Sequence, residues 1–194
     1  MKFTPDQLPT YQEIAMGLLD LATESAHGRP ESDDIYRRIT EYRDTGKAYS
    51  SCGDLCHWLL FRLGIRLPMI NRAEAGGWKA GVNISRLAWR DPARSAEHSE
   101  DYEPGDILAV WNKPDTTDAH VLVVRKHIGD HIHSADYGQP GGARRTRELV
   151  GRKLGSRNIM RVLKLRDILQ AASDEGGLSD YQTADYWLTG GHVA

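Results

Sequence analysis

The spacing of apolar residues changes once along the chain, near Pro104-Gly105, and this change constrains the fold more than any other feature. Before it, apolar residues recur every three to four positions, which is the spacing of helices that bury one face. After it, short apolar runs are separated by turn residues, which is typical of strands. Helices followed by an antiparallel meander predict an α+β domain.

Two amphipathic helices are predicted at the start, because apolar residues have helical spacing within 11–21 and again within 35–42. A third helix is predicted through the apolar segment Leu55 to Leu63, which Gly64 ends. Ser51 and Asp54 form a capping-box pattern ahead of it, so Cys52 should lie in its first turn. The irregular stretch from 69 to 103 is predicted to be a long surface connection.

Four strands are predicted beyond Pro104-Gly105, namely Asp106 to Trp111, His120 to Lys126, His131 to Ala135 and Ile159 to Leu165. Gly129-Asp130 suits a tight hairpin turn between the second and third of them, which would place Lys126 opposite His133. The charged run from Arg144 to Arg147 is predicted to be an exposed loop. The tail after Asp167 is expected to contain one short helical stretch.

Length and charge restrict the class of protein. A chain of 194 residues with 40% apolar composition suits a single domain, here 1–194, with a core at about 45–165, N-terminal helices at 8–44 and a tail at 166–194. The 25 basic and 27 acidic side chains nearly cancel, so neither nucleic acid nor a membrane is an expected partner. The first ten residues contain no signal peptide, so we expect synthesis in the cytoplasm and a monomeric product.

The two cysteines, Cys52 and Cys56, are too few for a disulfide framework. Cys56 shares a helix face with Leu59, Leu60 and Leu63, and is expected to be a small buried group. Cys52 stands beside small polar residues at the helix N-terminus, where the helix dipole favours a thiolate. We therefore expect Cys52 to be a nucleophile at a partly exposed position.

A thiolate nucleophile needs a histidine as its base, and His120 is the best candidate because it opens an apolar strand. His127, His131 and His133 crowd into one short segment and suggest zinc. However, the chain has neither a Cys-x-x-Cys pair nor a His-Glu-x-x-His helix. We therefore expect no metal and no cofactor.

Three blocks between residues 48 and 137 carry a family resemblance. The segment from Ser51-Cys52-Gly53-Asp54-Leu55 to Gly64-Ile65-Arg66-Leu67-Pro68 resembles the catalytic helix of the NlpC/p60 cell-wall peptidases. The segment Pro104 to Leu108, with Trp111, is similar to the first strand of that family and of the related CHAP amidases. Ala119 to Val124 resembles their histidine strand. The first and last quarters of the chain carry no such resemblance.

The resemblance implies a papain-like fold, in which the catalytic helix packs on an antiparallel sheet, with Cys52 as nucleophile and His120 as base. The residue that orients the histidine is then His133 in the NlpC-like pattern or Asp136 in the CHAP-like pattern. The predicted hairpin register leaves His133 roughly 20 Å along the ladder from His120. Asp136 lies nearer, but needs a bulge to reach the correct face, so it ranks only slightly higher.

Acyl chemistry also needs donors for an oxyanion, and by position these are Tyr49 or a backbone amide at Cys52 or Gly53. The resemblance implies an amidase or endopeptidase that cuts the peptide stems of bacterial peptidoglycan. Without a signal peptide, such an enzyme would act as a lysin, or as an antibacterial effector that a dedicated secretion system carries to a target periplasm. An effector would have a cognate immunity protein.

Two other functions stay open. A thiol hydrolase or acyltransferase that works on proteins or lipids inside a target cell would use the same chemistry. A binding module on the same scaffold, with no turnover and an incidental Cys52, belongs to another class of protein. Reactivity of Cys52 toward an alkylating agent separates the binding module from both enzymes.

Overall fold

The computed structural model describes residues 1–25, 51–65, 101–111, 120–137 and 143–182. The helical elements in these ranges are η1 (Pro5–Gln7), α1 (Leu8–Ser25), α3 (Ser51–Arg62) and α4 (Leu165–Asp174). The strands are β1 (Ile107–Trp111), β2 (His120–Ile128), β3 (His131–Ala135), β4 (Arg144–Val150), β5 (Lys153–Leu154) and β6 (Arg157–Leu163). No helix within these ranges has the length and apolar character that a membrane span requires.

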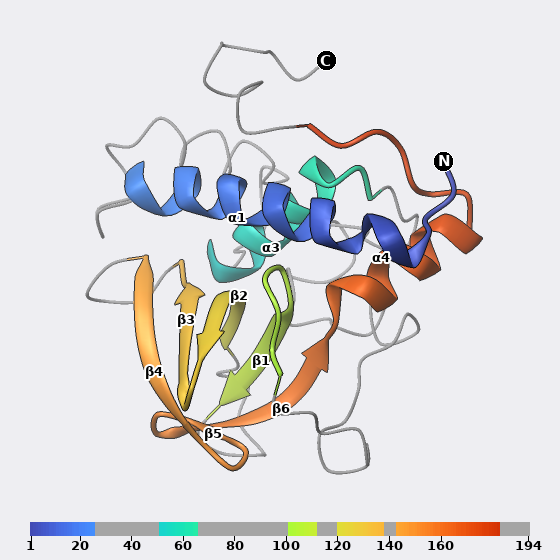
Figure 1. Cartoon of the computed structure of the whole chain (residues 1–194). Coiled ribbons are helices and arrows are strands. Elements are labelled where there is room, and N and C mark those ends of the chain that lie inside the picture. Colours follow the sequence, from blue (N-terminus) through green and yellow to red (C-terminus); the bar gives the residue numbers. More distant parts are fainter. Residues whose placement is uncertain (26–50, 66–100, 112–119, 138–142, 183–194) are drawn as a thin grey trace, which may run out of the picture.

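The six strands form a closed barrel in which every neighbouring pair is antiparallel and β6 returns to pair with β1. Helices α1 and α3 lie together on one side of this barrel, and α4 follows β6 beside them (Figure 1). The predicted α+β class is thus confirmed. Closure of the meander into a barrel was not predicted.

Alternate residues of β1 and β2 point to opposite sides of the sheet. One set fills the inside of the barrel, where it forms a cluster of Leu108, Val110, Leu122, Val124, Ile132, Leu154, Ile159 and Val162. The other set, which includes Ile107, Val121 and Val123, belongs to a second cluster with α1 and α3. The helices are therefore held on the barrel by apolar burial, which provides most of the driving force for folding.

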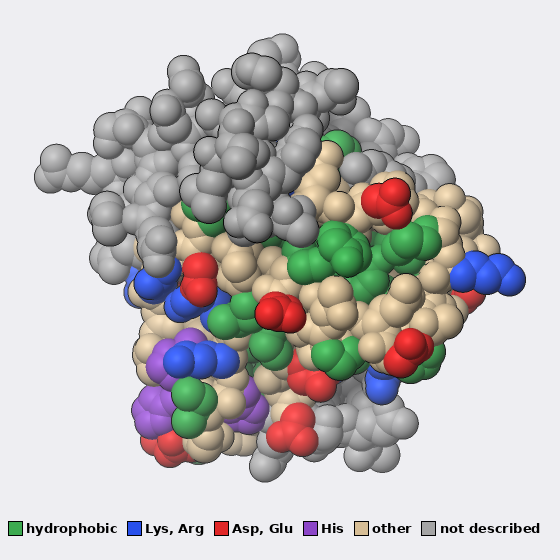
Figure 2. All heavy atoms as spheres, turned by 45° about the horizontal axis from the view of Figure 1, so that its top comes forward, with side chains coloured by type: hydrophobic (Ala, Val, Ile, Leu, Met, Phe, Trp, Pro, Cys, Tyr) green, Lys and Arg blue, Asp and Glu red, His purple; other side chains and the backbone are tan. Residues whose placement is uncertain are grey.

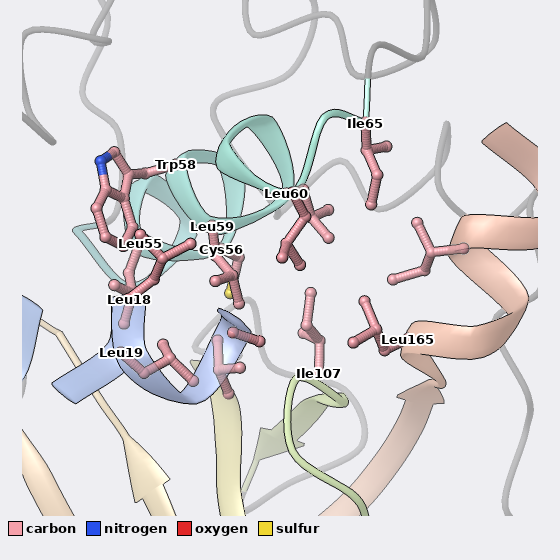
Figure 3. Close-up of a cluster of buried hydrophobic side chains, with 14 of the residues drawn as sticks. Leu18, Leu19, Leu55, Cys56, Trp58, Leu59, Leu60, Ile65, Ile107 and Leu165 are labelled. Atoms are coloured by element: carbon pink, nitrogen blue, oxygen red, sulfur yellow. The ribbon is translucent and has the colours of Figure 1, made fainter. Parts of the chain in front are cut away.

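Helix α3 is fixed at its C-terminal end by the chain that follows α4. Gly64, with φ of 79°, ends the helix, and Ile65 donates its amide back to Leu60 at 3.0 Å. The amide of Ser179 donates to the carbonyl of Gly64 at 2.8 Å, and that of Gln182 to Arg62 at 2.8 Å. Figure 3 shows the middle of the helix seated in the core, with the sulfur of Cys56 among leucines. This anchoring sets where the first turn of α3 lies.

Most predicted elements are found close to their predicted bounds. The strand His131 to Ala135 has the predicted bounds, and the other three predicted strands differ by at most two residues at either end. Cys52 lies in the first turn of α3, as predicted, and residues 129 and 130 form the hairpin turn. The predicted helix at 35–42 and nearly all of the predicted connection at 69–103 lie outside the described residues.

The prediction of an exposed loop at Arg144 to Arg147 is wrong, because these residues form the first half of β4. Arg145 lies opposite Ser134, and Arg147 lies opposite Ile132, whose side chain is inside the barrel. Residues opposite each other in a ladder point to the same side. Two of the three inward positions of β4 are therefore arginines and the third is Leu149, so the strand lacks the apolar alternation by which strands are recognised.

The tail contributes to the core beyond the single helical stretch that was predicted. Leu165, Ile168, Leu169 and Ala172 of α4 are buried, as is Leu178 after it. Asp106 joins this region to β1, since its carboxylate accepts hydrogen bonds from the Leu165 amide at 2.9 Å and from Lys164 Nζ at 2.5 Å. Burial raises the pKa of Asp106, although the Lys164 charge opposes that change.

Candidate active site

Cys52 and His120 come together where the start of α3 meets the start of β2. Cys52 is the second residue of α3, and His120 is the first residue of β2, against which α3 packs. A hydrogen bond links the two side chains. Cys52 was expected to be partly exposed, but only 6% of it is exposed, and 4% of His120. The thiol is buried because the helix lies flat on the barrel, which the sequence pattern did not reveal.

Asp136 completes this group, whereas His133 does not take part. His120 Nε2 lies 2.7 Å from Asp136 Oδ1, and the Asp136 side chain is fully buried. The ring of His133 instead hydrogen-bonds through Nδ1 to Thr146 Oγ1 at 2.9 Å. Partial burial and the charge of Lys126 lower the pKa of His133. Of the two candidates for the orienting position, the structure places Asp136 against His120.

The pairing of β2 with β3 explains this outcome. Lys126 lies opposite His133, which confirms the register predicted from the Gly129-Asp130 turn. A register shift then occurs between Val124 and Lys126, so that Val124 lies opposite Ser134. This is the bulge that Asp136 needs, because Ser134 and Asp136 now share a side of the sheet with Val124 and His120.

Two further residues hold Asp136, and sequence reasoning missed both. Arg147 donates two hydrogen bonds to the carboxylate, from Nη1 to Oδ2 at 3.0 Å and from Nη2 to Oδ1 at 2.8 Å. Ser134 Oγ donates to Oδ2 at 2.5 Å. The spacing Ser134-x-Asp136 was visible in the sequence. The role of Arg147 was not, because it depends on the pairing of β3 with β4.

The electrostatics of the site favour charged side chains. Burial opposes ionisation of Asp136, but the hydrogen bonds from His120 and Arg147 outweigh it and hold the pKa of this carboxyl well below its usual range. Burial likewise disfavours the imidazolium of His120, yet the hydrogen bonds to Asp136 and Cys52 raise its pKa above the usual value. The arrangement therefore suits a thiolate–imidazolium pair with a carboxylate behind it.

The proton on His120 can be assigned from these partners. Because Asp136 is ionised at neutral pH, Nε2 carries a proton and donates it to the carboxylate. Nδ1 is then the ring nitrogen left for Cys52. This nitrogen can accept the thiol proton and return it to a leaving group, which is the task of a general acid–base catalyst.

The predicted oxyanion donors are described only in part. Tyr49 lies outside the described residues, as do the side chains of Ser51 and Asp54 that would form the capping box. Gly53 is the third residue of α3, so its backbone amide is among the first four, which have no acceptor within a helix. An amide in this position, next to Cys52, can donate to an oxygen that gains negative charge.

The three neighbouring histidines lie elsewhere on the protein. Histidine side chains gather in one surface area in Figure 2. Of the histidines whose side chains the structure describes, His127, His131 and His133 of the β2–β3 hairpin are those that are not buried. His127 Nδ1 accepts from the Tyr102 amide at 3.4 Å, and His131 Nδ1 lies 2.5 Å from Asp130. Among the described residues, no three His, Cys, Asp or Glu side chains converge on a metal position.

Comparison with known proteins assigns no family to this arrangement, since no family model, no curated protein and no solved structure matches the chain.

Proposed function

We propose that this chain is a cysteine hydrolase with a papain-like site of the NlpC/p60 and CHAP type. Cys52 is the nucleophile, His120 the general acid and base, and Asp136 the residue that orients the histidine. The observation that supports this proposal is the continuous series of hydrogen bonds from Cys52 through His120 to Asp136, which starts at a helix N-terminus. The carboxylate in third position corresponds to the CHAP-like pattern.

The first half of the reaction forms a thioester. Cys52 gives its proton to His120 Nδ1, and the thiolate attacks an amide carbonyl carbon to make a carbon–sulfur bond. Backbone amides at the start of α3, including that of Gly53, stabilise the oxyanion. His120 then protonates the amine as the carbon–nitrogen bond breaks. The acyl group remains on Cys52, and the amine departs.

The second half of the reaction releases the acyl group. His120, neutral after giving its proton to the amine, takes a proton from water, and the hydroxide attacks the thioester carbon. The carbon–sulfur bond breaks, the carboxylic acid leaves, and the imidazolium returns its proton to the thiolate. Asp136 keeps Nε2 protonated throughout, so that Nδ1 alone exchanges protons.

Peptide stems of bacterial peptidoglycan are the proposed substrate, because the families that the three segments resemble cut them. The reaction type is supported by the residues of the site, and the substrate by the resemblance alone. An antibacterial effector or a lysin would meet this substrate in a target cell wall. A hydrolase acting on proteins or lipids would have the same site with another substrate.

The test combines substrate cleavage with alkylation of the two cysteines. We expect the protein to release new products from purified muropeptides, detected by their masses, and Cys52→Ala to abolish this release. Iodoacetamide at neutral pH should label Cys52 far faster than Cys56, and His120→Ala should slow the labelling. The site at Cys52 is buried, so labelling also reports how readily a small reagent enters.

Cys56 is the matched control, one helical turn away from Cys52. It is fully buried among leucines (Figure 3), so Cys56→Ala should cost about 1 kcal/mol of stability and leave activity intact. Equal labelling of the two cysteines, together with activity that survives Cys52→Ala, would remove the cysteine-hydrolase proposal. Rapid labelling of Cys52 without cleavage of muropeptides would instead favour a hydrolase with another substrate.

A further inference from the structure

Both oxygens of the Asp136 carboxylate are fully occupied. Oδ1 lies 2.7 Å from His120 Nε2 and 2.8 Å from Arg147 Nη2. Oδ2 lies 2.5 Å from Ser134 Oγ and 3.0 Å from Arg147 Nη1. Four contacts match the four lone-pair sites of an ionised carboxylate. The side chain of Asp136 has no exposed surface, so bulk water does not reach it.

The four contacts suit the ionised form of Asp136 best. Arg147 has donors alone, and it also donates to Ser134 Oγ at 2.9 Å, which turns the serine proton toward the carboxylate. A proton on Oδ2 would face only donors. A proton on Oδ1 could be accommodated only if His120 moved its own proton from Nε2 to Nδ1, and Arg147 Nη2 would still donate to the same oxygen. The network thus favours the ionised carboxylate, and with it a His120 that donates from Nε2.

We propose that Arg147 is a positioning residue of the active site, which keeps Asp136 charged and oriented so that His120 presents Nδ1 to Cys52. This inference rests on the proposed function, because it assigns a role within the same site. Arg147 touches neither Cys52 nor His120 in any of the hydrogen bonds given above, and it acts through the carboxylate. The bidentate fork fixes the plane of the carboxylate as well as its charge.

The need for Arg147 follows from the proton cycle of His120. When His120 is an imidazolium, Asp136 is paired with two cations. When His120 is neutral, Arg147 is the remaining cation that bonds to Asp136 within the described part of the chain. A buried carboxylate without a cation is costly and takes up a proton. Arg147, whose side chain is only 15% exposed, therefore prevents Asp136 from gaining a proton during turnover.

Arg145 provides a matched control on the same side of the same strand. It lies opposite Ser134, two residues from Arg147, and it is partly buried. Its Nε and Nη2 atoms make no hydrogen bond in the structure as described. Arg145→Met therefore removes one positive charge from the same side of β4 without removing a hydrogen-bond partner of the carboxylate. Any effect specific to Arg147→Met reports the contact with Asp136.

The experiment compares Arg147→Met, Arg147→Lys and Arg145→Met in the full chain. The first readout is the pH at which alkylation of Cys52 by iodoacetamide is half-maximal. Arg147→Met should raise this pH by about one unit or more, because the thiolate loses the charged network behind His120. Arg147→Lys, which keeps a charge without the fork, should give a smaller rise, and Arg145→Met should stay near the wild-type value.

The second readout is the tautomer of His120 by ring-nitrogen NMR, with the signal assigned through His120→Gln. At a pH above the pKa of His120, where the ring is neutral, the wild type should hold the Nε2-protonated form, and Arg147→Met should show a mixture of tautomers. An unchanged alkylation midpoint and an unchanged tautomer in Arg147→Met would overturn the proposal, as would equal effects in Arg145→Met. If Arg147→Met does not fold, Arg147→Lys decides by the same criteria.

Neither readout depends on a substrate, so failure of this inference is distinguishable from failure of the proposed function. A shift in Arg147→Met, in a protein that cleaves nothing, would retain the positioning role and remove the hydrolase. Cleavage of muropeptides by the wild type, together with an unchanged alkylation midpoint in Arg147→Met, would retain the hydrolase and remove the positioning role. Addition of methylguanidinium to Arg147→Met should restore part of the wild-type midpoint if the missing contact alone is responsible, and restoration should be absent in Arg145→Met.

Discussion

Arg125 is the residue that allows Asp136 to reach His120. It lies at the register shift between Val124 and Lys126, and its guanidinium binds Asp20 of α1. With regular pairing from Lys126 and His133 onward, Val124 would lie opposite Ala135, and Tyr137 would take the place of Asp136. Because Arg125 is an extra residue in β2, Asp136 takes the position that Tyr137 would otherwise have. The contact with Asp20 of α1 gives the Arg125 side chain a partner outside the β2–β3 ladder.

The orienting role of Asp136 leads to a prediction at this scale. Asp136→Ala should lower the turnover of the proposed hydrolase by roughly 10²-fold or more, because His120 loses the partner of Nε2. His133→Ala should change turnover little, since its ring contacts Thr146 instead of His120. Turnover and melting temperature are measured together, and Asp136→Asn serves if the alanine variant is too unstable. A larger loss in His133→Ala than in Asp136→Ala would assign the orienting role to His133.

Helix α3 works as an element because both of its ends are defined by contacts from distant parts of the chain. Its first turn meets β2, and its last turn meets the segment 178–182. The start and the end of the helix could be predicted, because capping residues and Gly64 are local signals. The partner of its C-terminal end could not, because no local pattern tells where a segment 115 residues away will dock.

Gly64 tests how far the position of α3 depends on this docking. Its φ is positive, and a Cβ there would lie 2.1 Å from the backbone oxygen of Ser179. Gly64→Ala should therefore combine backbone strain with displacement of the docked segment and lower stability by more than about 2 kcal/mol. Gly129 has φ of 58° with open space around it, so Gly129→Ala should cost only about 1 kcal/mol. Chemical denaturation measures both, and equal losses would mean that the docked segment moves freely.

At the scale of the whole molecule, local patterns predicted the fold class and most of the strands, and they failed where long-range pairing decides. β4 was missed because two of its three inward residues, Arg145 and Arg147, are polar, and Arg147 is stabilised by Ser134 of the neighbouring strand and by Asp136 just after it. Closure of the barrel depends on β5 and β6, of which β5 has two residues and no readable period. The Cys52 and His120 pair was predictable because a helix start and a strand start are both local signals. The role of Arg147 was not predictable, because it depends on contact with Asp136, which only the pairing of β3 with β4 brings close.

The pH dependence of stability connects the site to the whole fold. The pKa of Asp136 is depressed in the folded state, so its contribution is present above the unfolded value of 3.8 and is lost as the pH falls below it. The pKa of His120 is raised from 6.5, so its contribution is complete below that value and constant in the acid range. The pKa of Asp106 is raised, which makes its contribution change in the opposite sense as acid is added. The pH dependence of wild-type stability therefore combines the opposite contributions of Asp136 and Asp106.

The difference in unfolding free energy between the wild type and Asp136→Asn isolates the contribution of Asp136. Below pH 4, the wild type should lose up to about 1.4 kcal/mol of unfolding free energy per pH unit relative to Asp136→Asn, because one more proton is bound on unfolding. The measurement is urea denaturation at several pH values between 2 and 7. Asp174→Asn, which removes an exposed carboxylate at the end of α4, controls for the loss of one negative charge. Parallel curves for the wild type and Asp136→Asn would show that Asp136 is not held as an anion, and both its orienting role and that of Arg147 would then lose their electrostatic basis.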